Sequence, residues 1–201
     1  MEKQLHHGSE PKRMAIISSA KSLFLDIGIE HTSISLISKE AGVAKSLFYY
    51  YFETKEELVL AIIEELCDEH LHNLERKIES EAHDSLDSLL ILVNSFLVFT
   101  HKESAFQGEH DFNIRCHNVY LIKIQTLVTK IISMAQEEGY VVIKYPMETF
   151  MMMLEGLLRL QQEGLSQDKV VSMIEQTLHL PQSSLVDKAL YYLHNFEKEV
   201  D

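Results

Sequence analysis

The chain contains a short run of side chains that could contact the edges of nucleic-acid bases, namely Lys45, Ser46, Leu47 and Tyr49. A lysine can donate to guanine acceptors, a serine can exchange hydrogen bonds with several base edges, and a leucine can pack on a thymine methyl group. Tyr50 and Lys55 lie just beyond, where a phenol and an ammonium group could donate to phosphate oxygens. This pattern predicts base contacts from the first four residues and backbone contacts from the other two.

Two short helices joined by a tight turn are expected to position these side chains. Thr32-Ser33 supplies a hydroxyl cap for a helix that stops at Ala41-Gly42, where glycine can take the left-handed conformation. A second helix starts near Ala44, and the spacing of Thr54 and Glu57 predicts a capping box that opens a third. In a helix-turn-helix unit the second helix enters the major groove. We include Thr32 and Ser33 among the expected DNA contacts.

The segment resembles the N-terminal domain of the TetR family of bacterial transcriptional regulators. The resemblance rests on Phe24, Gly28, Thr32-Ser33, Ile37, Ala41-Gly42-Val43, the aromatic run Phe48–Phe52, and Lys55-Glu56-Glu57-Leu58. Leu36, Ser46, Leu47 and Tyr51 depart from the usual pattern, and the first three leave the operator sequence open. The resemblance implies a homodimer that binds a palindromic operator and is released by a small-molecule effector.

The aromatic run is expected to divide between core and surface. Phe48, Phe52 and Tyr51 lie three or four residues apart, the spacing of one helical face, which favours packing. Tyr49 and Tyr50 have no such packing partners, so we interpret them as DNA contacts.

Composition and periodicity predict an all-α protein of two domains. The 201 residues contain only seven glycines and three prolines, and apolar residues recur at helical spacing. We expect a three-helix DNA-binding domain over residues 1–56 and a larger helical domain for effector binding and dimerisation over residues 57–201. Helices are expected at about 10–27, 55–80, 84–101, 104–114, 117–138, 146–163, 167–178 and 184–198, besides the two short ones.

The net charge of −13 is unevenly distributed. Residues 1–56 contain seven Lys and Arg against seven Asp and Glu, whereas the remainder contains eleven against twenty-four. The acidic remainder would repel phosphate and favour approach by the neutral end, although most of these carboxylates are explained equally well as a solvated surface.

Cysteine content and targeting signals favour a cytoplasmic protein. Cys67 and Cys116 lack metal-ligand spacing and are interpreted as buried apolar residues rather than a disulfide or a redox switch. The N-terminus is polar, and no apolar stretch approaches the roughly 18 residues of a membrane span. We expect no cofactor and no membrane partner.

Two apolar stripes are candidates for a dimer interface, because each could join a four-helix bundle with a second copy. Packing within one subunit is the alternative. The predicted interface residues are Phe150, Leu154, Leu157, Leu158, Leu190 and Leu193.

Aromatic and methionine side chains between residues 84 and 160 could line an effector pocket, although each could equally be ordinary core. The predicted lining is Phe96, Phe99, Phe112, Tyr120, Met152 and Met153.

Polar residues near the middle of the chain could supply specificity to that pocket. They are His101, Glu109, His110, Asp111, Arg115 and His117, and their histidines lack the i, i+4 spacing of a helical metal site. No catalytic motif is present. The sequence therefore predicts an effector-responsive transcriptional regulator, and a repressor is favoured over an activator. The alternatives are an effector-independent DNA-binding protein and a helical enzyme with a histidine–carboxylate pocket.

Overall fold

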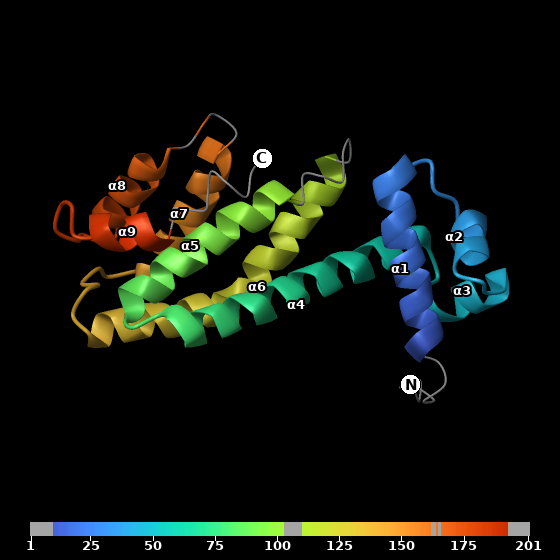
Figure 1. Cartoon of the computed structure of the whole chain (residues 1–201), viewed down its shortest axis with the longest axis horizontal. Helices are drawn as coiled ribbons and strands as arrows, with labels where there is room; N and C mark the ends of the chain where they lie inside the picture. Colours follow the sequence, from blue (N-terminus) through green and yellow to red (C-terminus); the bar gives the residue numbers. More distant parts are fainter. Residues whose placement is uncertain (1–9, 103–109, 162–163, 165, 193–201) are drawn as a thin grey trace. The chain divides into compact units, whose positions relative to one another are not determined.

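The computed structural model describes residues 10–102, 110–161, 164 and 166–192, which form α-helices and connecting turns without a strand (Figure 1). The helices are α1 (Glu10–Ile27), α2 (Ile34–Glu40), α3 (Lys45–Tyr51), α4 (Lys55–Glu81), α5 (Ser85–Lys102), α6 (His110–Glu137), α7 (Pro146–Gln161), α8 (Gln167–Thr177) and α9 (Val186–Tyr192). The all-α prediction is confirmed.

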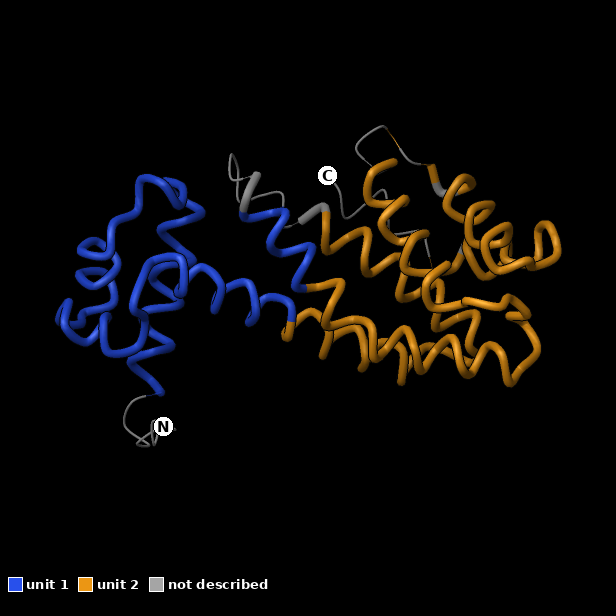
Figure 2. The backbone as a smooth tube through the Cα atoms, turned by 180° about the vertical axis from the view of Figure 1, so that it is seen from behind, with its two compact units in different colours: residues 1–67, 104–119 blue, residues 68–103, 120–201 orange. Residues whose placement is uncertain are grey.

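The described chain groups into two compact units (Figure 2). Unit 1 comprises residues 1–67 and 104–119, and unit 2 comprises residues 68–103 and 120–201. Helices α4 and α6 therefore contribute to both units. The predicted boundary at residue 56 lies near the start of α4, whereas the contacts keep α4 with unit 1 as far as Cys67.

Local signals define the short helices of unit 1. The Ser33 hydroxyl accepts a hydrogen bond from the Leu36 amide at 3.2 Å and begins α2, and Gly42 follows it with φ of +63°. The Thr54 hydroxyl accepts from the Glu57 amide at 3.0 Å, and the Glu57 carboxylate accepts from the Glu53 amide at 2.6 Å. The predicted caps are confirmed, since the Ser33 and Thr54 hydroxyls each satisfy an amide that the first turn of a helix leaves unpaired. The Glu57 carboxylate closes the second cap on the amide of Glu53, one residue before Thr54.

The core of unit 1 lies where α1, α2 and α3 pack together. Ile16, Ala20, Ile37 and Phe48 are fully buried, and Phe24 is 2% exposed. Burial of these apolar groups fixes which face of α3 points outward.

Helix α5 is the centre of unit 2. It packs against α7 and α9, and nearly every side chain from Leu86 to Thr100 is buried. The Lys188 ammonium on α9 contacts the carboxylates of Asp84, at 2.7 Å, and Asp87, at 2.5 Å, while the Tyr192 hydroxyl donates to the Glu81 carbonyl at 2.9 Å. These polar contacts anchor α9 at the start of α5.

One predicted division is wrong. Separate helices were expected at 104–114 and 117–138, but α6 continues through Arg115 and Cys116 without interruption. The sequence of α6 contains no proline or glycine that would stop the helix.

Candidate nucleic-acid interface

Helix α3 presents an exposed polar and aromatic face. Lys45 and Ser46 are exposed in its first turn, Leu47 is half-buried, and Tyr49 and Tyr50 are 48% and 50% exposed. Five of the predicted contact residues therefore share one short helix. Tyr49 contacts the Phe48 ring and Tyr50 contacts the Tyr51 ring, and about half of each tyrosine remains exposed.

Buried aromatic rings hold that face in place. Phe48 packs edge-on against Tyr49, with ring centroids 5.6 Å apart, and lies 5.8 Å from the ring of Phe52. The Arg13 guanidinium on α1 covers the Phe52 ring at 5.4 Å. The burial predicted for Phe48 and Phe52 is confirmed, and Tyr51 is half-buried with its ring 5.0 Å from Tyr50.

Thr32 and Ser33 serve the turn before α2. Thr32 is 1% exposed and its hydroxyl donates to the Gly28 carbonyl at 2.7 Å, so its prediction as a DNA contact is wrong for the side chain. Ser33 is exposed, but its hydroxyl is the α2 cap. Both hydroxyls stabilise the turn, which is the physical reason for their position.

Lys55 also has a structural partner that the sequence did not indicate. Its ammonium donates to the Ile29 carbonyl at 2.8 Å and to the Thr32 carbonyl at 3.3 Å. A lysine has three donor hydrogens, and two are used here. The predicted phosphate contact therefore gives way to a primary role in holding the loop between α1 and α2.

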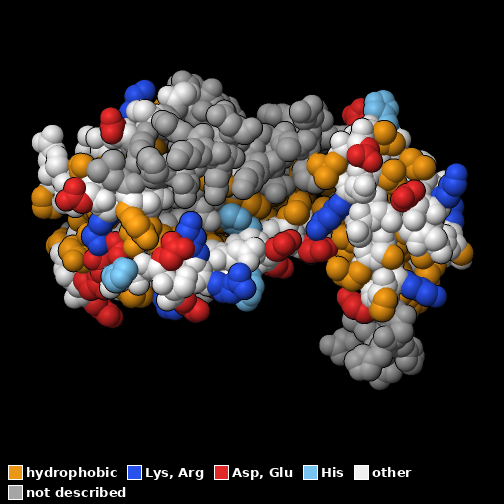
Figure 3. Space-filling model, viewed as in Figure 1, with side chains coloured by type: hydrophobic (Ala, Val, Ile, Leu, Met, Phe, Trp, Pro, Cys, Tyr) orange, Lys and Arg blue, Asp and Glu red, His pale blue; other side chains and the backbone are white. Residues whose placement is uncertain are grey.

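An exposed cation missing from the predicted set, Lys39, lies in the last turn of α2. Its position near the end of the first helix of the helix-turn-helix unit could have indicated Lys39 as a DNA contact from the sequence. Figure 3 shows basic and acidic side chains intermixed over unit 1, consistent with the balanced charge of residues 1–56.

Three of the predicted effector-pocket residues meet in unit 2. The Tyr120 ring lies 4.4 Å from Phe99 and 6.0 Å from Phe96, measured between centroids, and all three side chains are buried. The His70 imidazole joins them at 4.4 Å from Phe99, and its Nε2 is 2.9 Å from the Ser95 hydroxyl. The sequence reasoning missed His70 and Ser95 because their proximity depends on the packing of α4 against α5.

The other three predicted pocket residues lie elsewhere. Phe112 belongs to unit 1, where it lines a cavity of about 200 Å³ with Ile29, Glu30, Lys55, Glu56, Val59 and Arg115. Met153 is buried on α7, but Met152 is 73% exposed, so the prediction that Met152 lines an internal pocket is wrong. Consecutive helical residues point about 100° apart, which places these two methionines on different faces.

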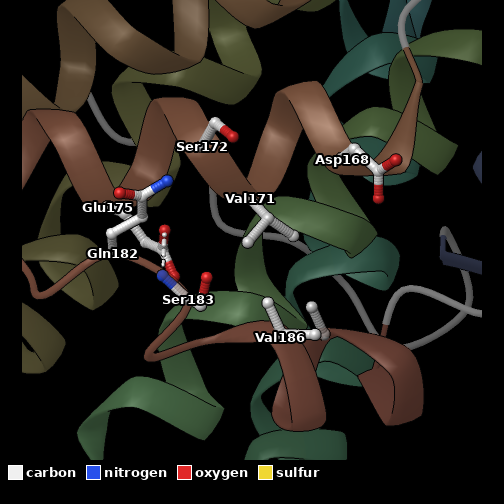
Figure 4. Close-up of a pocket in the computed structure, with 8 residues that line it drawn as sticks. Asp168, Val171, Ser172, Glu175, Gln182, Ser183 and Val186 are labelled. Atoms are coloured by element: carbon white, nitrogen blue, oxygen red, sulfur yellow. Dashed lines mark hydrogen bonds between the residues drawn. The ribbon is translucent and has the colours of Figure 1, made fainter.

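A second hollow lies between α8 and α9 (Figure 4). It has a volume of about 250 Å³ and is lined in part by Asp168, Val171, Glu175 and Ser183. The Glu175 carboxylate accepts hydrogen bonds from the Ser183 amide at 3.0 Å and the Leu185 amide at 2.9 Å. Glu175 therefore supports the loop before α9, and the hollow is smaller than the roughly 300 Å³ at which ligand pockets usually begin.

The predicted dimer residues on α7 are used within the chain. Phe150, Leu154 and Leu157 have no exposed surface within the single chain, so these side chains pack inside it, and their contact with a second copy stays a prediction. Their stripe packs towards α5 and α8. Leu158 is half-buried, the side chain of Leu190 and all of Leu193 lie outside the described residues, and Leu185 and Ala189 of α9 are buried.

The polar set around the start of α6 falls only partly within the described structure. Glu109 and the side chains of His101, His110 and Asp111 lie outside it, Arg115 is exposed and His117 is half-buried. Among the described residues no group of three metal-ligating side chains occurs. No helix in the same part of the chain is long and apolar enough to span a membrane.

Residues 16–62 match the model of "Bacterial regulatory proteins, tetR family". The chain is 28% identical over 104 residues to a fatty acid metabolism regulator protein of Bacillus subtilis, a match covering 52% of this chain and 50% of the relative. It is 35% identical over 89 residues to the probable HTH-type transcriptional regulator ArpR of Pseudomonas putida, covering 44% and 41%. The matched part thus spans half or less of these relatives.

A solved structure extends the likeness of fold along nearly the whole chain. The transcriptional regulator FadR from Bacillus subtilis in complex with stearoyl-CoA matches with a TM-score of 0.58 and 17% sequence identity, over 94% of this chain and 99% of that one. At this identity the match shows the arrangement of helices and does not transfer the ligand.

Proposed function

We propose that this chain, which belongs to the tetR family of bacterial regulatory proteins, is a homodimeric transcriptional repressor that a small-molecule effector releases from a palindromic operator. The observation that carries the proposal is the exposed face of α3, with Lys45, Ser46, Tyr49 and Tyr50 outward and Phe48 locked beneath. The second helix of a helix-turn-helix unit presents such an exposed face to the major groove.

The side chains divide by chemistry. Lys45 and Ser46, at the start of α3, contact base edges; Leu47 packs on a thymine methyl group; and Tyr49 reaches the same groove. Tyr50 donates its hydroxyl to a phosphate, and Lys39 supplies a further backbone contact from α2. Lys55 acts indirectly, because its ammonium fixes the loop that leads into α2.

Dimerisation follows from the operator geometry, since one three-helix head covers only a half-site. The buried stripe of α7 leaves its opposite face for a partner. Met152 is the most exposed apolar side chain on that helix, and Tyr191 on α9 is 72% exposed. We propose that these exposed side chains of α7 and α9 take part in the interface.

Effector response is supported by two features. The similarly folded regulator FadR from Bacillus subtilis was solved in complex with stearoyl-CoA. In this chain the His70–Ser95 hydrogen bond places polar groups beside the ring cluster of Phe99 and Tyr120. A mostly apolar site with a few polar groups is what a small ligand needs. Two-site coupling of about 1–3 kcal/mol would change operator affinity roughly 5- to 150-fold.

Selection of genomic fragments by the purified protein tests the DNA-binding proposal. Enrichment of one palindrome, with affinity that falls steeply with salt, is the expected result. Indifference to every fragment at low ionic strength would reject it. Thermal-shift screening against acyl-CoA esters and aromatic acids then tests effector binding, because a ligand of the folded state raises the melting temperature.

A further inference from the structure

The two cysteines of the chain, separated by 49 positions in sequence, meet between α4 and α6. The Cys67 thiol is 3.9 Å from the backbone carbonyl oxygen of Cys116, and both side chains have no exposed surface. No disulfide joins them in the structure. They are the only cysteines in the protein.

The contact makes the two cysteines direct neighbours, because the Cys67 sulfur touches the Cys116 backbone. Disulfides join residues whose Cα atoms are roughly 4.4–6.8 Å apart. Closing the bond therefore requires the two thiols to turn towards each other and the two helices to meet this Cα separation.

Neighbouring contacts keep the two helices close beyond the cysteines. One turn further along, the His70 and Tyr120 rings lie 5.3 Å apart, and the Lys123 ammonium contacts the Asp68 carboxylate at 2.6 Å. Both pairs again join α4 to α6. The two cysteines are therefore held as neighbouring residues on these two helices.

We propose that Cys67 and Cys116 are a peroxide-sensitive pair whose disulfide ties α4 to α6 and lowers the affinity of the protein for DNA. The DNA-binding consequence rests on the proposed function, whereas formation of the disulfide does not. The assigned oxidant is a small peroxide, because both thiols are buried and only a molecule close in size to water reaches them through local opening.

The reaction balances in two steps. One thiolate attacks a peroxide oxygen, so that an S–O bond forms, the O–O bond breaks, and hydroxide leaves and takes up a proton as water. The second thiol then attacks the sulfenic sulfur, forming the S–S bond and releasing the oxygen as water. Hydrogen peroxide is reduced to two waters while the cysteines lose two electrons and two protons.

The location of the pair explains how the bond would reach the DNA-binding face. Helix α4 starts at Lys55, whose ammonium holds the carbonyls of Ile29 and Thr32 in the loop before α2. Cys67 lies on the same helix and within the same compact unit. A shift of α4 that closes the disulfide therefore moves this loop and, with it, α2 and α3.

The test uses the chain of residues 1–201 and the DNA fragment selected above. Reduced protein is treated with hydrogen peroxide, then examined by intact mass and by DNA binding before and after dithiothreitol. We expect a mass loss of about 2 Da, the signature of one disulfide, a fall in affinity of at least about tenfold, and recovery on reduction. Cys116→Ala and Cys67→Ala should bind DNA like the reduced wild type and keep that affinity in peroxide.

Three results would overturn the proposal: an unmodified pair under peroxide that fully oxidises glutathione, a complete disulfide with unchanged affinity, or the same loss of affinity in Cys116→Ala. If one alanine variant fails to fold, the other and the wild-type mass still decide. Failure of the reduced protein to bind any fragment rejects the proposed function instead. Intact mass and the melting temperature of the oxidised protein then decide whether the pair closes.

Discussion

Helices α3 and α7 use their aromatic and apolar side chains in opposite ways. In α3 only Phe48 is buried, while Tyr49 and Tyr50 are about half exposed. In α7 Phe150, Leu154 and Leu157 are fully buried, and Met152 stands alone on the outside. Large exposed side chains on a seven-residue helix call for an external partner, whereas a wide stripe on a sixteen-residue helix is satisfied by its own subunit.

The largest expected difference is between alanine substitutions at a buried and at an exposed aromatic residue of α3. Phe48→Ala removes a fully buried ring from a small core and should lower the free energy of unfolding by about 3–5 kcal/mol. Tyr49→Ala should change it by less than about 0.5 kcal/mol yet weaken DNA binding. Chemical denaturation and fragment binding of both variants check this. Equal loss of stability would mean that Tyr49 is core.

The corresponding pair of alanine substitutions on α7 should differ slightly less in stability. Leu154→Ala leaves a cavity and should cost about 2–5 kcal/mol, whereas Met152→Ala should leave the subunit stable and weaken self-association. Denaturation and analytical ultracentrifugation of the two variants measure these outcomes. A Met152→Ala protein that dimerises like the wild type would place the interface elsewhere.

Local signals explain why the reading helices were predictable and the rest was not. Ser33, Gly42 and Thr54 act on amides within a few residues of themselves, so their spacing in sequence already specifies the caps. The stripe of Phe150 and Leu154 shows that one face is apolar but not which helix covers it. The sequence therefore predicted which face of α7 is buried but did not predict which helices cover that face.

The roles of Lys55 and of the cysteines depend on contacts distant in sequence. Lys55 reaches Ile29, 26 positions away, and Cys67 reaches Cys116, 49 positions away. The residues next to this lysine and these two cysteines in the sequence do not indicate those distant partners. The burial of Thr32 was hidden for the same reason, because its hydroxyl bonds to a preceding carbonyl only after the turn has formed.

Acid should loosen unit 2 before it affects the α3 surface, because Asp87 of unit 2 is buried and the described residues of unit 1 include no buried carboxylate. Burial raises the pKa of Asp87, but hydrogen bonds from Lys188 and from the His83 amide outweigh it, so the pKa lies below its usual value. The stabilisation is therefore present above the ordinary Asp pKa and is lost as pH falls through the lowered one. Asp87→Asn should cost about 1–3 kcal/mol at neutral pH.

Denaturation of the Asp87→Asn variant and the wild type between pH 7 and about pH 2 checks the sign, because the lowered pKa of Asp87 lies below the ordinary Asp value. The variant should approach the wild type in stability as the pH falls, because the wild-type carboxyl becomes neutral. A constant difference across that range would show that the carboxylate charge contributes nothing. Lys188 behaves inversely: although burial lowers its pKa, Asp84 and Asp87 raise it above the ordinary value, so its contribution is lost only at strongly alkaline pH.

Of the lysine substitutions, Lys55→Met should have the smallest effect on DNA binding. Loss of the two hydrogen bonds to loop carbonyls should lower the free energy of unfolding by about 1–3 kcal/mol. The salt dependence of DNA binding should stay close to that of the wild type, because the ammonium is engaged inside the fold. Lys39→Met is the matched control, and its loss should reduce the salt slope by about one. The opposite assignment of slopes would restore Lys55 as a phosphate contact.

Selection of operator sequences by wild type and by Lys45→Ala, in parallel, tests most directly the claim that α3 reads bases. The variant should keep its stability and lose preference at one position of each half-site, by about 1–3 kcal/mol, while the rest of the palindrome is unchanged. A uniform loss of affinity across all sequences, or no change at all, would contradict the placement of α3 in the groove.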